Sequence, residues 1–188
     1  MIDPMRDTEP VQFIVEPLDP ASADPGLATE LSDLVNDVYA TAEEGMWVDG
    51  ANRTTPEEMS SLIAAGEILV ARSPEGRILG SVRLHDVGPD VAEFGLLAAS
   101  REQRNLGVGR ALLDDAEDRS RARGMQAMQL ELLVPREWGQ PTKEFLGAWY
   151  ARRGYRLIDI VDFEEDYPHL APLLATPCDL QIHRKALV

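Results

Sequence analysis

The sequence predicts a mixed α/β domain in which helices flank a largely antiparallel sheet. Apolar residues alternate with polar ones in several short segments between turn residues, as in half-buried strands. Other segments have apolar residues at helical spacing and carry helix start and stop signals. The short turn Ser73–Gly76 joins the strands expected at 67–72 and 78–84, so these two strands should form an antiparallel hairpin. Together these patterns favour one mixed sheet.

The same signals set the expected elements in chain order. Thr55 as N-cap and Pro56 at the first helical position predict a helix start, and Gly124 is suited to end the longest helix. Helices are expected at 27–40, 55–65, 106–123 and 142–153. Strands are expected at 13–18, 67–72, 78–84, 91–99, 128–134, 155–160 and 179–185.

Length and composition indicate a single folded domain over residues 1–188, with residues 1–11 as a loose N-terminal tail. The chain has 188 residues, of which 44% are hydrophobic and 27% charged, so it can bury one core. No apolar run approaches the ~20 residues that cross a bilayer, and no signal-peptide core opens the chain. We therefore expect a cytoplasmic protein without a membrane partner.

Charge and metal-ligand content exclude two further classes. The net charge of −15 repels phosphate backbones, so nucleic acid is not an expected partner. The single cysteine, Cys178, allows no intramolecular disulfide, and the three histidines show no metal-binding spacing. We expect no metal site and no cysteine nucleophile.

The segment from Glu93 to Leu113 is the most informative part of the sequence. A strand leads into a short glycine-containing loop, and the loop opens a long helix. Glycine lets the backbone approach a ligand closely, and the first N–H groups of a helix have no internal partner. With the positive end of the helix dipole they form an anion site. Three nearby arginines, Arg101, Arg104 and Arg110, should add positive charge.

Arg104-x-x-Gly107-x-Gly109 resembles the Q/R-x-x-G-x-G/A signature of the GCN5-related N-acetyltransferase (GNAT) superfamily. Tyr150-Ala151-Arg152-Arg153-Gly154-Tyr155 is similar to the Y-x-x-x-G-[FY] block of that family. The resemblance covers about residues 67–160. It implies the acyl-CoA N-acyltransferase (GNAT) fold, with acetyl-CoA as co-substrate.

The resemblance also implies where the coenzyme binds. In the family, two neighbouring parallel strands splay apart and hold the pantetheine arm, here the segments 96–99 and 129–133. The implied coenzyme contacts are Leu97, Ala98, Ala99, Arg104, Asn105, Leu106, Gly107, Val108, Gly109 and Arg110.

Two residues are predicted to be catalytic. Tyr150 falls where family members often keep a tyrosine beside the coenzyme sulfur, where a phenol can protonate the leaving thiolate. Glu93 matches the position of the general base in the histone-acetylating branch, and burial can raise its pKa to a useful value. A core role for Tyr150 and a solvent-facing role for Glu93 remain open alternatives, and Glu131 is a second candidate base.

The chain departs from the family in two places. Lys143 stands where many members have an asparagine that contacts the coenzyme arm, and the connection 135–141 is longer than usual. We expect Lys143 at the surface, with a contact to the coenzyme phosphates from Lys143 or Arg136 as the alternative.

The function implied is an acetyl-CoA-dependent N-acetyltransferase acting by direct attack of a primary amine of a small molecule or peptide. The acceptor site is expected around residues 43–47, the loop that follows them, and the hairpin around Arg83 and His85. Glu43 and Glu44 beside Trp47 could receive a cation, with a solvated loop anchored by Trp47 as the alternative. The alternative is a non-catalytic acyl-CoA binding or sensing domain. Transfer of another acyl group and a homodimer paired through the last strand also remain open.

Overall fold

The computed structural model describes residues 12–101 and 106–187 of the 188-residue chain. Within these ranges, one sheet contains strands in the order β1-β2-β3-β4-β5-β7-β6, and only the β4–β5 pair is parallel. The strands are β1 (Ile14–Pro17), β2 (Ile68–Arg72), β3 (Ile78–Asp86), β4 (Val91–Ala99), β5 (Ala127–Pro135), β6 (Arg156–Asp162) and β7 (Cys178–Ala186). The prediction of a mixed, mostly antiparallel sheet is confirmed.

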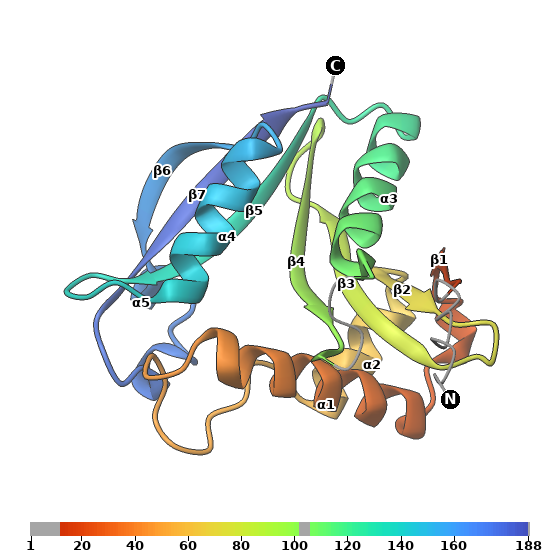
Figure 1. Cartoon of the computed structure of the whole chain (residues 1–188), viewed down its shortest axis with the longest axis horizontal. Helices are drawn as coiled ribbons and strands as arrows, with labels where there is room; N and C mark the ends of the chain where they lie inside the picture. Colours follow the sequence, from red (N-terminus) through yellow and green to blue (C-terminus); the bar gives the residue numbers. More distant parts are fainter. Residues whose placement is uncertain (1–11, 102–105, 188) are drawn as a thin grey trace, which may run out of the picture.

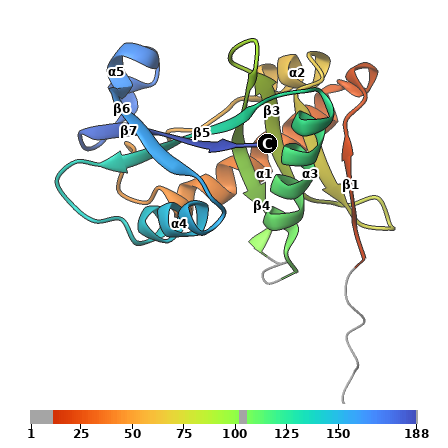
Figure 2. The ribbon, with the colours of Figure 1, turned by 90° about the horizontal axis from the view of Figure 1, so that it is seen from above.

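Helices cover both faces of this sheet. They are α1 (Pro25–Ala42), α2 (Pro56–Ala64), α3 (Val108–Ala122), α4 (Pro141–Arg152) and the short α5 (Phe163–Asp166). Figure 2 shows α3 and α4 on one side of the sheet and α2 on the other. The strand pattern explains this layering, because Leu69 and Ala71 point into the core under α3 while Val70 points into the core under α1 and α2. No helix in the described ranges is long and apolar enough to cross a membrane.

Local capping explains the helix boundaries. The side chains of Asp24, Thr55 and Gln140 accept hydrogen bonds from the first-turn N–H groups of α1, α2 and α4, and each helix has proline at its start. After α3, Gly124 adopts φ +83°, a left-handed conformation that costs glycine little. The expected start of α2 and end of α3 are therefore confirmed.

Strand β7 lies between β5 and β6 and pairs with both. Both of its edges are consequently occupied within the chain. The idea that the last strand pairs across a dimer is wrong for this arrangement, because the strand has no free edge. Strand β6 instead forms the edge of the sheet.

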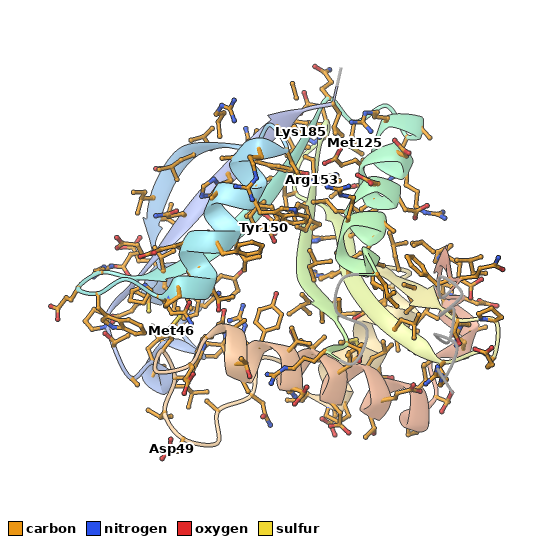
Figure 3. All side chains as sticks on the ribbon, in the orientation of Figure 1. Met46, Asp49, Met125, Tyr150, Arg153 and Lys185 are labelled. Atoms are coloured by element: carbon orange, nitrogen blue, oxygen red, sulfur yellow. The ribbon has the colours of Figure 1, made fainter. Side chains whose placement is uncertain are left out.

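The buried carboxylate of Glu117 links the C-terminal half of α3 to β7 and to the residues that follow α4. Glu117 of α3 is 3% exposed and accepts hydrogen bonds from the Tyr155 hydroxyl (3.0 Å) and Lys185 Nζ (2.6 Å). Arg153 also pairs with Glu117 and with Asp114 of the same helix. Figure 3 shows Arg153 and Lys185 in this region between α3, α4 and β7. The contacts fix α3 relative to α4 across the parallel strand pair.

Candidate functional site

The parallel strands β4 and β5 separate at the centre of the molecule. They pair only from Val91–Ala127 to Glu93–Gln129. Beyond these residues they diverge, which Figure 1 shows as the widening space between the two strands below their upper ends. From Phe94 to Ala99, strand β4 therefore has no sheet partner on its β5 side among the described residues. Backbone polar groups along this edge are available to a ligand.

The backbone of β4 is irregular at this opening. Leu96 has φ +47°, the one non-glycine residue with positive φ among the described residues, and the pairing with β3 shifts register beside it. A left-handed leucine costs roughly 1–2 kcal/mol, and such strain is often found at functional sites. The bulge turns Leu97 toward the core under α3, while Ala98 packs on the α1–α2 side.

Helix α3 begins at an uncapped end, as an anion site requires. Its N-cap is Gly107, at φ +77°, and no side chain of residues 12–101 or 106–187 bonds the first N–H groups. A Cβ added at Gly107 or at Gly109 would have no described atom within 4 Å, apart from the adjacent residues and the backbone of the helix itself. Both glycines therefore leave open space at the helix start. The predicted contacts Arg104 and Asn105 lie outside the described residues. The described part of the loop thus fits a bound diphosphate.

Close packing fixes the position of this helix start. Val108 is buried at 2% exposure in the core, while Leu106 is half-buried against it. A Cβ at Gly80 of β3 would lie only 2.7 Å from a Val108 methyl carbon and from the Ala98 carbonyl oxygen. Only glycine therefore lets α3 sit this close to the sheet.

Arg110 and Arg101, the two described arginines near the loop, have different surroundings. Arg110 is exposed in the first turn of α3, where its charge can reach a bound anion. Arg101 instead donates a hydrogen bond to the Asp37 carbonyl oxygen on α1 at 2.8 Å. The Arg101 guanidinium is therefore held against α1, and its contribution of charge to the loop stays a prediction.

Glu93 is buried where β4 and β5 part. It is 8% exposed and its Oε2 accepts a hydrogen bond from Gln129 Nε2 at 2.8 Å. Arg184 donates to Gln129 Oε1, which orients the amide so that its nitrogen faces Glu93. Burial, and then the charge of Glu131, raise the pKa of Glu93 to about 7. The open alternative of a solvent-facing carboxylate does not hold.

Other polar groups surround Glu93 from β3 and β5. His85 lies opposite Glu93 in the β3–β4 pairing, with its Nε2 3.7 Å from Glu93 Oε1. Burial lowers the pKa of His85, which keeps the ring neutral. Glu131 Oε2 accepts a hydrogen bond from the Tyr167 hydroxyl at 2.5 Å. Tyr167, which follows α5, was not expected at the site, since nothing near it in the sequence indicates a role.

Tyr150 projects from α4 toward β4, as Figure 3 shows. Its ring packs 5.8 Å from Phe94 and 6.0 Å from Tyr155 between ring centroids, and the residue is 6% exposed. Burial raises the pKa of its hydroxyl above the ordinary value, so the phenol keeps its proton. Its hydroxyl makes no hydrogen bond with the described residues. The ring belongs to the core, while the residue also lines the central cavity.

A cavity of about 440 Å³ brings the two predicted catalytic residues together. Its wall includes Glu93, Leu97 and Tyr150, and also the expected acceptor residues Arg83 and His85. Residues from α1, the α1–α2 loop, α2, β5, α4 and the segment after β6 complete the wall, among them Tyr39, Glu43, Asn52, Arg53, Glu58, Glu131, Lys143, Leu146, Tyr167 and His169.

Lys143 is buried, so the expectation of a surface lysine is wrong. It is 5% exposed, and its Nζ donates to Glu43 Oε1 at 2.6 Å. Glu43 is 3% exposed, and its Oε2 accepts from Trp47 Nε1 at 2.6 Å. Burial would raise the pKa of Glu43, but the charges of Arg53 and Lys143 outweigh it and lower the pKa. Glu43 is thus already paired and cannot receive a cation, and Glu44 is exposed.

Two further residues considered in the sequence, Arg136 and Cys178, lie at the surface and in the core respectively. Arg136 pairs at the surface with Asp179 and Asp162, so the structure gives no contact toward the coenzyme loop. Burial raises the pKa of the Cys178 thiol to about 11, which makes it a poor nucleophile.

Comparison with known families agrees with this geometry. Residues 32–147 match the family model described as the Acetyltransferase (GNAT) family. No curated protein sequence gives a significant match.

Solved structures with the same fold cover nearly the whole chain. An IAA acetyltransferase from Bacillus cereus has 16% sequence identity and a TM-score of 0.60, over 93% of this chain and 99% of its own. A GCN5-related N-acetyltransferase from Kribbella flavida has 21% identity and a TM-score of 0.62, over 93% and 97%. An N-acetylglutamate synthase from Neisseria gonorrhoeae, complexed with coenzyme A and N-acetyl-glutamate, has 18% identity and a TM-score of 0.63, over 94% of this chain and 35% of its own.

Proposed function

Because this chain belongs to the Acetyltransferase (GNAT) family, we propose that it is an acetyl-CoA-dependent N-acetyltransferase that acts on a primary amine. The observation that carries the proposal is the parting of β4 and β5 over a cavity lined by both Glu93 and Tyr150. A base and a proton donor on one cavity favour an enzyme over a non-catalytic acyl-CoA binding domain.

The helix start supports coenzyme binding. A diphosphate would fit the start of α3, where the described residues offer no side-chain cap to the first N–H groups, space is open at Gly107 and Gly109, and Arg110 adds charge. The unpaired edge of β4 at Leu97 to Ala99 suits the amide-containing pantetheine arm, which can bond to strand backbone. One structure of the same fold contains coenzyme A. The motif residues Arg104 and Asn105 complete the proposed coenzyme contacts.

Acetyl transfer to an amine requires removal of a proton from nitrogen. An alkylammonium has a pKa near ~10.4 and carries no lone pair, so a base must take its proton before or during attack. Glu93, with a pKa of about 7, is ionised in part at neutral pH and can accept it. The amine nitrogen then forms a bond to the thioester carbonyl carbon, and the carbon–sulfur bond breaks to release the coenzyme thiolate.

Tyr150 is the proposed partner of that thiolate. Its raised pKa keeps the hydroxyl protonated, so it can donate a hydrogen bond to sulfur as negative charge develops. A thiol has a pKa of ~8.5, below that of the phenol, so the phenol does not readily give up its proton to the thiolate. Tyr150 therefore first stabilises the thiolate through a hydrogen bond, and complete proton transfer to sulfur follows. Starting from the alkylammonium, the nitrogen loses two protons: one ends on the coenzyme sulfur, and the other is released to solvent through Glu93.

The experiment combines binding and turnover. Calorimetry with coenzyme A should show binding to the purified protein, and thiol release from acetyl-CoA should occur with some members of an amine library. Gly109→Asp should abolish coenzyme binding, because it places a carboxylate and bulk in the open space of the anion site.

The same change should leave the fold intact, since a carboxylate in the first turn of a helix is stabilising by roughly 0.3–1 kcal/mol. Gly88→Asp is the matched control, because a Cβ there also meets no described neighbour within 4 Å. Absence of coenzyme binding in the unaltered protein would exclude the proposed function.

A further inference from the structure

Arg53 carries an unusual positive charge on the wall of the central cavity. Its guanidinium lies over the rings of Tyr39 and Trp47, with its carbon 5.3 Å and 5.2 Å from the ring centroids. Its side chain is 22% exposed and makes no hydrogen bond with the described residues, and its Nε is buried without such a partner. Two aromatic rings thus hold a guanidinium whose N–H donors are unused.

The nearby carboxylate does not neutralise this charge. Glu43 Oε2 lies 3.5 Å from Arg53 Nε, but Glu43 already accepts shorter bonds from Lys143 and Trp47, both of 2.6 Å. One carboxylate therefore faces two cations, which leaves one positive charge in surplus. No other described carboxylate lies within 4.0 Å of Arg53.

Carboxylate side chains line another part of the same cavity. Glu93 and Glu131 stand at the parting of β4 and β5, on the cavity that Arg53 also lines. Tyr167 lines the same cavity, and its hydroxyl donates a hydrogen bond to Glu131 Oε2 at 2.5 Å. Glu93 and Glu131 thus supply negative charge where β4 and β5 part, and Arg53 supplies positive charge beside Tyr39 and Trp47. Of the other charged residues on the wall, Arg83 is paired with Glu67, and Glu58 accepts a hydrogen bond from Thr54.

We propose that Arg53 binds a carboxylate of the acceptor, so that the substrates are amines that also carry a carboxylate group. The proposal rests on the acetyl transfer proposed above and names its acceptor class. A planar carboxylate can accept two parallel hydrogen bonds from the planar guanidinium, which is the geometry that arginine recognises best. Glu93 and Glu131 face the amine at the other end of the same molecule.

The test compares matched acceptors that differ only in the carboxylate. Thiol release from acetyl-CoA is measured with α-amino acids and straight-chain ω-amino acids of increasing length, each beside its own carboxamide. The unaltered protein should use its preferred amino acid about 10- to 100-fold better than the amide in kcat/KM, as for a charge-assisted hydrogen bond. The chain length that reacts best reports the separation between Arg53 and the reacting nitrogen.

Arg53→Gln should reduce this ratio to about 1 by raising the KM of the amino acid, while the KM of acetyl-CoA stays unchanged. Arg53→Lys should retain part of the preference, because it keeps the charge but loses the planar donor pair. Arg77→Gln, at an exposed position in the turn between β2 and β3, is the matched control and should retain the full preference. Circular dichroism and thermal unfolding verify that each variant is folded.

The outcomes separate the two proposals. Turnover of amides and amino acids with equal efficiency, or an undiminished preference in Arg53→Gln, would overturn the role of Arg53 and leave acetyl transfer standing. Absence of both coenzyme binding and amine turnover would overturn the acetyl transfer itself.

If coenzyme A binds but no acceptor in the panel reacts, calorimetry decides. The coenzyme A-saturated protein is titrated with the N-acetylated amino acids and with their amides. Tighter binding of the carboxylates, lost in Arg53→Gln, supports the proposal, and equal binding or no binding of the two sets refutes it.

Discussion

At the scale of single residues, Glu93 shows how burial can provide a base for neutral pH. Its pKa is about 7 because the carboxyl is buried and Glu131 stands nearby, while Gln129 and Arg83 act in the opposite direction. The neighbouring His85 and Tyr167 stay neutral, because burial lowers the pKa of the one and raises that of the other. The environment thus supplies one group that titrates in the working range.

Glu93→Gln should lower kcat/KM for the acceptor by about 100-fold or more, the usual contribution of a general base. For the unaltered enzyme, the acceptor kcat/KM should rise with pH to a plateau, with an inflection near pH 7 as Glu93 ionises. The variant should lack this inflection. Glu30→Gln, at an exposed position on α1, is the control. An identical pH profile in Glu93→Gln would assign the base to another group.

Glu93→Gln should lower activity but raise the stability of the folded protein. A carboxyl whose folded pKa is raised from 4.5 to about 7 contributes stability below pH 4.5 that is lost as the pH rises through 7. Glu93→Gln removes this loss. The variant should therefore gain stability relative to the unaltered protein between pH 5 and pH 8, by roughly 1–3 kcal/mol in denaturant unfolding. A difference that does not vary with pH would contradict the raised pKa.

Tyr150→Phe separates the hydroxyl from the ring. The ring contacts with Phe94 and Tyr155 remain, and the hydroxyl makes no hydrogen bond with the described residues, so stability should change by less than about 1 kcal/mol. Turnover of the best acceptor should fall about 10- to 100-fold at unchanged coenzyme affinity, because the thiolate loses a hydrogen bond.

Tyr155→Phe gives the reverse pattern and serves as the control. It removes the hydrogen bond to the buried Glu117 and should cost about 1–3 kcal/mol of stability, with little effect on turnover. Unchanged turnover by Tyr150→Phe across the amine library would remove the proposed role of Tyr150 at sulfur.

At the scale of elements, most helices and strands could be predicted from the sequence because the signals that mark them are local. Thr55 and Pro56 mark the start of α2, and Gly124 marks the end of α3, through bonds and dihedral angles within one turn. Alternating apolar residues mark β3 and β4 because each strand has a buried face. These elements lie within two residues of their expected bounds.

Elements without such signals were not predicted. Helix α5 has one turn, too short for a periodic pattern, although it brings Tyr167 to the site. The place of β7 between β5 and β6 depends on pairing between segments far apart in the chain, which local pattern does not encode. The parting of β4 from β5 was expected only through the family resemblance.

Side-chain environments at the site were the least predictable part. The motif indicated Glu93 and Tyr150, and both line the central cavity. Arg53 was not singled out within the loop expected at the acceptor site, and nothing in the sequence indicated that Lys143 is buried. Lys143 is 100 residues from Glu43, so its burial could not be anticipated from its neighbours in sequence.

At the scale of the whole molecule, the ion pair of Glu43 and Lys143 joins two halves that the parted strands leave separate. Glu43 follows α1, on the half of the sheet that contains β1 to β4, and Lys143 lies on α4, which packs against β5. Figure 1 shows α1 and α4 approaching each other below the opening between β4 and β5. The pair therefore joins the two halves at the wall of the central cavity, which both residues line, and Lys143 shares α4 with Tyr150.

Lys143→Met should destabilise the protein by about 3 kcal/mol, because the buried Glu43 carboxylate loses its 2.6 Å bond from Lys143 and keeps only the more distant Arg53, at 3.5 Å, as a cation. For a chain of this size, that loss corresponds to about 6–12 °C in Tm. The double variant Glu43→Gln and Lys143→Met should recover most of the loss, since a neutral amide still accepts the Trp47 hydrogen bond and neither member of the ion pair remains charged. Arg152→Met, an exposed cation on the same helix, should change stability by less than about 0.5 kcal/mol. If denaturant unfolding finds the double variant no more stable than Lys143→Met, the two side chains are not energetically coupled, and packing of α4 alone must hold the halves together.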